Sequence, residues 1–147
     1  PVPGETGGDW WENVGQREAR LAFAAEQGRP ADESELEIFT HDWPAELVAE
    51  SAEHELGQSG RPFEDPWPLE RWPDVPTRVV LGTQDRCFAP DLIRRLSQER
   101  LGITPDEVES GHVPAFGNPD ALVALLEGHL CEVGIPPARP REGRAAR

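Results

Sequence analysis

Two short polar segments in the second half of the chain contain residues that could perform acid–base chemistry. The first spans residues 82–86 and contains Asp85, and the second spans residues 110–112 and ends in His112. A carboxylate beside an imidazole fixes the tautomer of the ring. It also stabilises the imidazolium that forms when the ring takes a proton from a hydroxyl nucleophile. Asp85 and His112 are therefore candidates for the acid and the base of a catalytic triad.

Each segment follows a run of residues that predicts a short β-strand. Residues 77–81 are apolar and β-branched, which suits a strand buried on both faces, and residues 106–109 predict a weaker second strand. Neighbouring strands lie about 4.8 Å apart, and the carboxyl ends of parallel strands meet at one edge of a sheet. Asp85 and His112 are therefore expected to lie within hydrogen-bonding distance.

Helices are expected after both strands. Residues 91–100 have helical spacing and end before Gly102, and a last helix starts where Asn118 caps Pro119. The order strand, helix, strand, helix predicts an α/β class protein with a right-handed parallel crossover.

The pattern of the first 60 residues predicts a mainly helical cap region. Residues 9–28 predict one amphipathic helix that begins at Asp9, and Pro44 opens a second helix that runs from Ala45 to about Leu56. Residues 34–39 are ambiguous.

The rest of the chain divides into three parts. Residues 61–76 contain five prolines interleaved with tryptophans, which excludes a helix or a central strand and predicts an extended connector. Residues 77–133 form the β-α-β-α unit, and the arginine-rich residues 134–147 predict a disordered basic tail.

No nucleophile is evident in the sequence. The nucleophile elbow Gly-x-Ser-x-Gly does not occur, and Ser59 lies near Gly57 and Gly60 at the wrong spacing. Cys87 has no base beside it in the required order and is interpreted as a packed thiol. With only two widely spaced cysteines, reduced thiols are expected rather than a disulfide.

Composition narrows the possible partners and the compartment. The formal net charge is -14, and the acidic residues concentrate in the first half, which disfavours nucleic acid and anionic membranes as partners. No apolar run approaches about 18 residues and no leader opens the chain, so we expect a cytoplasmic protein. His54 and His129 lack partners at metal-ligand spacing. We therefore expect no metal and no cofactor, and a small molecule as substrate.

The second half of the chain resembles the end of an α/β-hydrolase. Residues 79–85, Val-Val-Leu-Gly-Thr-Gln-Asp, resemble the penultimate catalytic strand and its acid loop. Residues 109–112, Glu-Ser-Gly-His, and residues 118–120, Asn-Pro-Asp, resemble the histidine loop and the last helix.

The cap region extends this resemblance. Residues 39–44, Phe-Thr-His-Asp-Trp-Pro, and residues 66–69, Pro-Trp-Pro-Leu, are similar to the lid of small, esterase-like bacterial members. His41 and Trp43 of this lid-like region are candidates to line the substrate pocket, while packing is the more frequent role of such side chains. The resemblance implies that Asp85 orients His112, which acts as base and then as acid for a serine that attacks an ester-like carbonyl. Related members of this fold act instead as dehalogenases, C–C hydrolases or cyanohydrin lyases.

The sequence is expected to be the C-terminal portion of such an enzyme. It does not begin with Met, and two short parallel strands do not make a stable sheet alone. The nucleophile and further strands are therefore expected upstream, and the isolated chain is expected to be inactive. The alternative is a non-catalytic remnant or binding module, which an exposed sheet edge would allow to self-associate or to pair with a partner.

Overall fold

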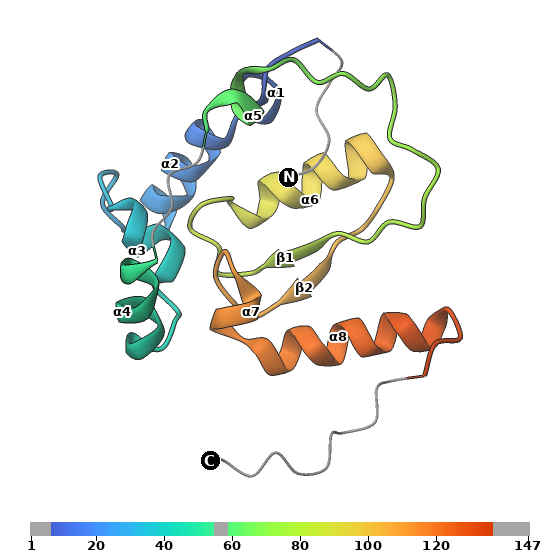
Figure 1. Cartoon of the computed structure of the whole chain (residues 1–147). Coiled ribbons are helices and arrows are strands. Elements are labelled where there is room, and N and C mark those ends of the chain that lie inside the picture. The colour runs from blue at the N-terminus through green and yellow to red at the C-terminus, as the bar shows by residue number, and fades with distance from the viewer. Residues whose placement is uncertain (1–6, 55–58, 137–147) are drawn as a thin grey trace.

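The computed structural model describes residues 7–54 and 59–136. In that part of the chain, two short strands lie between two long helices. A group of shorter helices from the cap region lies beside the carboxyl ends of the strands (Figure 1). This arrangement confirms the predicted α/β class.

The sheet is a parallel pair formed by β1, Val80–Gly82, and β2, Asp106–Val108. The register pairs Leu81 with Glu107. Leu81 and Val108 are both buried. Because β1 and β2 pair in parallel, the segment between them is the crossover that the order of elements predicted.

Gly82 belongs to β1, although the sequence pattern placed the end of the strand before it. A Cβ atom on Gly82 would lie 2.1 Å from the carbonyl oxygen of Gly111 and 2.4 Å from that of Ser110. The glycine is therefore needed because the histidine loop crosses β1 closely, not because the strand stops there.

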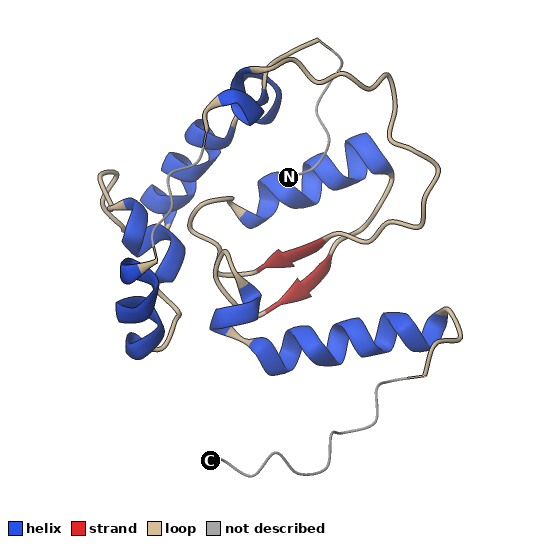
Figure 2. Ribbon diagram, viewed as in Figure 1, coloured by secondary structure: helices blue, strands red, loops and turns tan. Residues whose placement is uncertain are grey.

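Two helices flank the sheet, one on each face (Figure 2). α6, Pro90–Leu101, ends at Gly102, and α8, Pro119–Glu132, begins after Asn118, whose side chain accepts a hydrogen bond from the amide of Ala121. Both predicted helices are confirmed. A short helix between β2 and α8, α7, Pro114–Gly117, was not predicted.

Between residues 7 and 54, the cap region forms four helices: α1, Trp10–Val14; α2, Gln16–Glu26; α3, Glu35–Thr40; and α4, Ala45–Glu53. The prediction of one helix over residues 9–28 is wrong, because Gly15 takes a left-handed conformation, φ 62°, that separates α1 from α2. The ambiguous segment becomes α3 because Ser34 and Glu37 form a capping box.

The predictions for three other segments have mixed outcomes. The end of α4 was expected near Leu56, which lies outside the described residues. Residues 61–76 were expected to exclude a helix, yet Arg61–Glu64 forms α5 because Pro62 lies in the first turn, where a proline loses no helical hydrogen bond. Most of the predicted basic tail, residues 137–147, lies outside the described residues.

An apolar core joins the cap region to α6. Val14 of α1 packs with Ala89, Leu92 and Leu96, and Trp10 and Phe23 lie against this cluster. The cap region is thereby anchored on the helix that directly follows the Asp85 loop. Among the described residues, no helix is both long enough and apolar enough to cross a membrane.

Candidate active site

Asp85 and His112 meet at the carboxyl ends of the two strands. Asp85 lies three residues after β1, and His112 lies four residues after β2. The Nδ1 atom of His112 is 2.9 Å from the Oδ2 atom of Asp85. The structure thus brings the two predicted residues together, while their catalytic role stays a prediction.

The second oxygen of Asp85 is held by the backbone. Oδ1 accepts hydrogen bonds from the amides of Cys87, at 2.7 Å, and of Phe88, at 2.9 Å. The Asp85 residue is only 7% exposed. Because both oxygens have donors, the carboxylate has a fixed orientation and presents one oxygen to His112.

Two aromatic rings enclose the imidazole of His112. The ring of Phe88 stacks on it with centroids 5.3 Å apart, and the ring of Phe39 from α3 meets it edge-on at 4.9 Å. These contacts limit rotation of the imidazole. They also place an apolar wall from the cap region beside it.

This geometry determines which nitrogen of His112 can act as a base. An ionised carboxylate can only accept hydrogen bonds, so the Nδ1 atom facing Asp85 must carry a proton. In the neutral ring, Nε2 then has the free lone pair. His112 is therefore suited to take a proton at Nε2 while Asp85 stabilises the resulting imidazolium.

None of the serines, all of which lie in the described residues, is recorded as a partner of His112. Four of them form hydrogen bonds elsewhere, namely Ser34, Ser51, Ser59 and Ser110. Ser97 is buried in α6. No serine of the described residues therefore contacts His112 as a nucleophile of a triad would.

Cys87 is a poor substitute for that nucleophile. Burial, followed by the negative charge of Asp85, raises the pKa of the Cys87 thiol to about 11. The side-chain amide of Gln16 donates to the carbonyl oxygen of Cys87 at 2.6 Å. At neutral pH the thiol is protonated and unreactive, because the thiolate is the nucleophilic form.

The two predicted pocket residues lie near the histidine loop. The Nε2 atom of His41 is buried, has no hydrogen-bond partner among the described residues and faces Gly111. Burial, followed by the positive charge of Arg86, lowers the pKa of His41 below its usual 6.5, although the charge of Asp42 opposes this. This shift favours the neutral form of the His41 imidazole.

Trp43 lies against α7. Its ring packs on that of Phe116 with centroids 4.5 Å apart, and its Nε1 atom is buried with no hydrogen-bond partner among the described residues. A role for His41 and Trp43 in substrate binding stays a prediction.

Asp42, which lies within the lid-like segment 39–44, was not predicted as a functional residue. The Asp42 carboxylate contacts the histidine loop through Ser110 and Gly111. The sequence contained one indication of such a role, because this acidic residue lies among aromatic residues in a region expected to cover the site.

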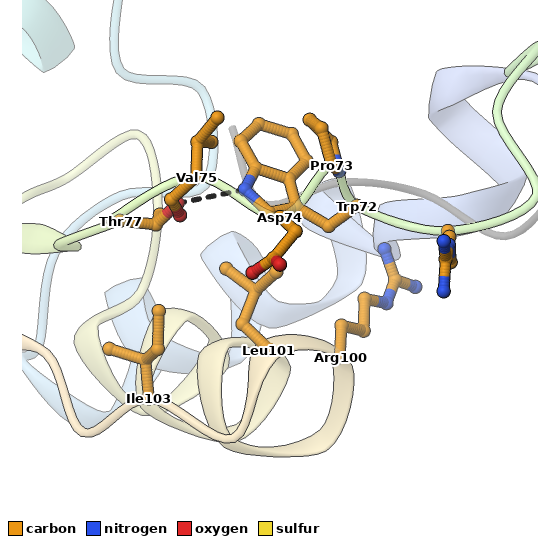
Figure 3. Close-up of a pocket in the computed structure, with 9 residues that line it drawn as sticks. Trp72, Pro73, Asp74, Val75, Thr77, Arg100, Leu101 and Ile103 are labelled. Atoms are coloured by element: carbon orange, nitrogen blue, oxygen red, sulfur yellow. Dashed lines mark hydrogen bonds between the residues drawn. The ribbon is translucent and has the colours of Figure 1, made fainter.

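A shallow pocket lies elsewhere, at the amino ends of the strands (Figure 3). It has a volume of about 510 Å³ and is lined by residues of the connector and of the end of α6, including Trp72, Val75 and Leu101. The indole of Trp72 donates to the hydroxyl of Thr77 at 2.8 Å across its rim. It is separate from the Asp85–His112 pair.

The other titratable clusters do not resemble a metal centre. The Nε2 atom of His129 on α8 lies 3.2 Å from a carboxylate oxygen of Asp106. Within the described part of the chain, no group of three or more histidine, cysteine, aspartate or glutamate residues could hold a metal ion.

The fold and the site together define a class of protein. A parallel α/β unit that places an aspartate and a histidine at adjacent strand ends is typical of hydrolases with a catalytic triad. The model of the alpha/beta hydrolase family matches residues 3–125, and the chain belongs to this family. Comparison with curated proteins and with solved structures gave no match.

Proposed function

We propose that this chain provides the acid and the base of a nucleophile–His–Asp triad in an enzyme that hydrolyses a small ester-like substrate. The nucleophile is proposed to come from residues outside this sequence. The observation that supports the proposal best is the 2.9 Å contact between His112 and the doubly anchored carboxylate of Asp85. Family membership supports a hydrolytic reaction.

The proposed reaction assigns each proton to an atom. The Nε2 atom of His112 takes the proton of the nucleophile hydroxyl as its oxygen attacks the carbonyl carbon. His112 then returns that proton to the departing alcohol oxygen, which leaves an acyl-enzyme. A water molecule, deprotonated by the same nitrogen, attacks the acyl carbon. His112 then returns this proton to the nucleophile oxygen as its bond to the acyl carbon breaks, which releases the acid and restores the enzyme. Asp85 remains ionised throughout and stabilises the imidazolium.

The test is an assay with a short-chain chromogenic ester on two purified proteins. One is the 147-residue chain, and the other is extended upstream to the start of its coding region. We expect turnover in the extended protein alone. In that protein His112→Ala should lower kcat by at least about 10³-fold, because the base of a triad is lost.

The matched control is His54→Ala, which replaces an exposed histidine at the end of α4. It should leave kcat unchanged. Full activity in the His112→Ala protein would remove His112 from the mechanism. Turnover in the short chain would show that a nucleophile lies within this sequence, and turnover of a haloalkane instead of the ester would identify a dehalogenase.

A further inference from the structure

The cap region inserts one carboxylate against the loop that ends in His112. The Oδ2 atom of Asp42 accepts hydrogen bonds from the hydroxyl of Ser110, at 2.9 Å, and from the amide of Gly111, at 2.5 Å. Asp42 lies between α3 and α4, 69 positions before Gly111 in the sequence. The two donors are the residues that immediately precede His112.

The space around this carboxylate depends on two glycines. A Cβ atom on Gly117 would lie 1.9 Å from the Oδ2 atom of Asp42, and one on Gly111 would lie 2.5 Å from Oδ1. Any larger residue at either position would displace the carboxylate or the loop. The histidine loop and α7 therefore leave a space that fits Asp42.

The Asp42 residue is partly buried. Burying a carboxylate is unfavourable unless hydrogen bonds compensate for the lost hydration. Its donor Ser110 is 1% exposed. The Oδ1 atom of Asp42 is buried without a hydrogen-bond partner among the described residues, so the recorded hydrogen bonds of this carboxylate all go to the histidine loop.

A second ionic contact links the cap region to the other loop of the pair. The carboxylate of Glu33, whose side chain is 6% exposed, lies 3.0 Å from the guanidinium of Arg86, the residue after Asp85. Glu33 also pairs with Arg29. The cap region thus contacts both loops directly beside the two residues of the proposed triad.

From these contacts we infer that Asp42 is a positioning residue. It holds Ser110 and Gly111 in place, so that the Nδ1 atom of His112 stays within hydrogen-bonding distance of Asp85. The inference rests on the proposed function for its catalytic consequence. The structural part of the inference, that Asp42 fixes the position of the His112 ring, does not depend on the proposed function. The cap region would then set the geometry of the base in addition to any role in covering the substrate.

The first measurement is NMR spectroscopy of the 147-residue chain labelled with ¹⁵N, in the parent and in Asp42→Ala. Loss of an acceptor should speed hydrogen exchange of the Gly111 amide by about tenfold, since one net hydrogen bond is removed. The Nδ1 proton signal of His112 should broaden, because the ring no longer stays on Asp85. Asp42→Asn keeps one acceptor oxygen and should give an intermediate result.

The matched control is Asp32→Ala, which removes an exposed aspartate of the cap region. It should leave both signals unchanged. Ser110→Ala provides a milder test if Asp42→Ala does not fold, because it removes one of the two donors and should shift the His112 signals in the same direction by less. His112 and Gly111 signals unchanged in both Asp42→Ala and Ser110→Ala would overturn the inference.

The second measurement is ester turnover by the extended protein. Asp42→Ala should lower kcat by about a hundredfold, as expected for a displacement of the base near 1 Å, with KM changed less than about twofold. A raised KM at unchanged kcat would assign Asp42 to substrate binding and overturn the positioning role. If the parent itself lacks activity while the NMR shifts occur, the proposed function fails and the positioning of His112 by Asp42 stands.

Discussion

Around the carboxyl ends of β1 and β2, polar groups are buried and bonded, whereas along α8 apolar groups are exposed. Asp85 and Ser110 are 7% and 1% exposed, and both make hydrogen bonds. On α8, Val123 is 52% exposed and Leu126 is 46% exposed, and no described residue of the helix is buried. In the sequence, Val113, α7 and Asn118 connect the two regions.

This difference indicates where the chain tolerates change. A buried polar network has few alternative arrangements, because each displaced donor or acceptor loses a partner that water cannot replace. A helix whose side chains face open space has no such constraint. Substitutions of the same kind should therefore change the stability of the protein in opposite directions, or by very different amounts, in the two regions.

The largest contrast is expected from one methyl group added in each region. Gly82→Ala places a Cβ atom 2.1 Å from the Gly111 carbonyl oxygen and should destabilise the fold by on the order of 3 kcal/mol through overpacking. Gly128→Ala on α8 meets nothing within 4 Å and should stabilise it by roughly 0.5–1 kcal/mol, because alanine favours a helix. Urea unfolding of both proteins measures the difference. Equal changes in the free energy of unfolding for the two substitutions would contradict the predicted difference between the two regions.

The next contrast concerns the two thiols. Cys87 beside the site has a pKa raised to about 11, whereas Cys131 on α8 is exposed. At pH 8, iodoacetamide should modify Cys87 about a hundredfold more slowly than an ordinary exposed thiol, because only the thiolate reacts.

Mass spectrometry of peptides from the native protein, taken over time, measures both rates. In concentrated urea the rates should converge, which provides the control. Comparable rates in the native protein would mean that the loop around Cys87 opens readily. The site would then be less rigid than its hydrogen bonds indicate.

The smallest effect is expected from protonation of His41. Burial lowers the pKa of His41 in the folded state, so the unfolded chain binds the proton more tightly. Stability should therefore fall as pH decreases below about 6.5, by roughly 0.5 kcal/mol or less, since partial exposure screens the effect. His41→Gln should weaken this dependence in urea unfolding at pH 7.5 and 5.5, whereas His54→Gln should not. If the stability of His41→Gln depends on pH as strongly as that of the parent, a group other than His41 causes the dependence.

Local patterns in the sequence were sufficient to predict the parallel unit that places Asp85 and His112. The apolar run before Asp85, the glycine after α6 and the Asn118 cap are each recognisable within a few residues, because strand and helix periods are local properties. The misassigned elements were those in which a local signal had two interpretations. Gly15 interrupted a helical pattern, and Pro62 began a short helix within a proline-rich connector.

The sequence by itself thus determined the class of fold, the meeting of Asp85 with His112 and the lack of an evident nucleophile motif. Only the tertiary structure decided why Gly82 must lack a side chain, and that Asp42 contacts the two residues before His112. Both features depend on atoms from segments far apart in the chain that approach within a few ångströms. No periodicity or motif within either segment specifies such a contact, because it exists only once the cap region has packed against α6 and the histidine loop has crossed β1.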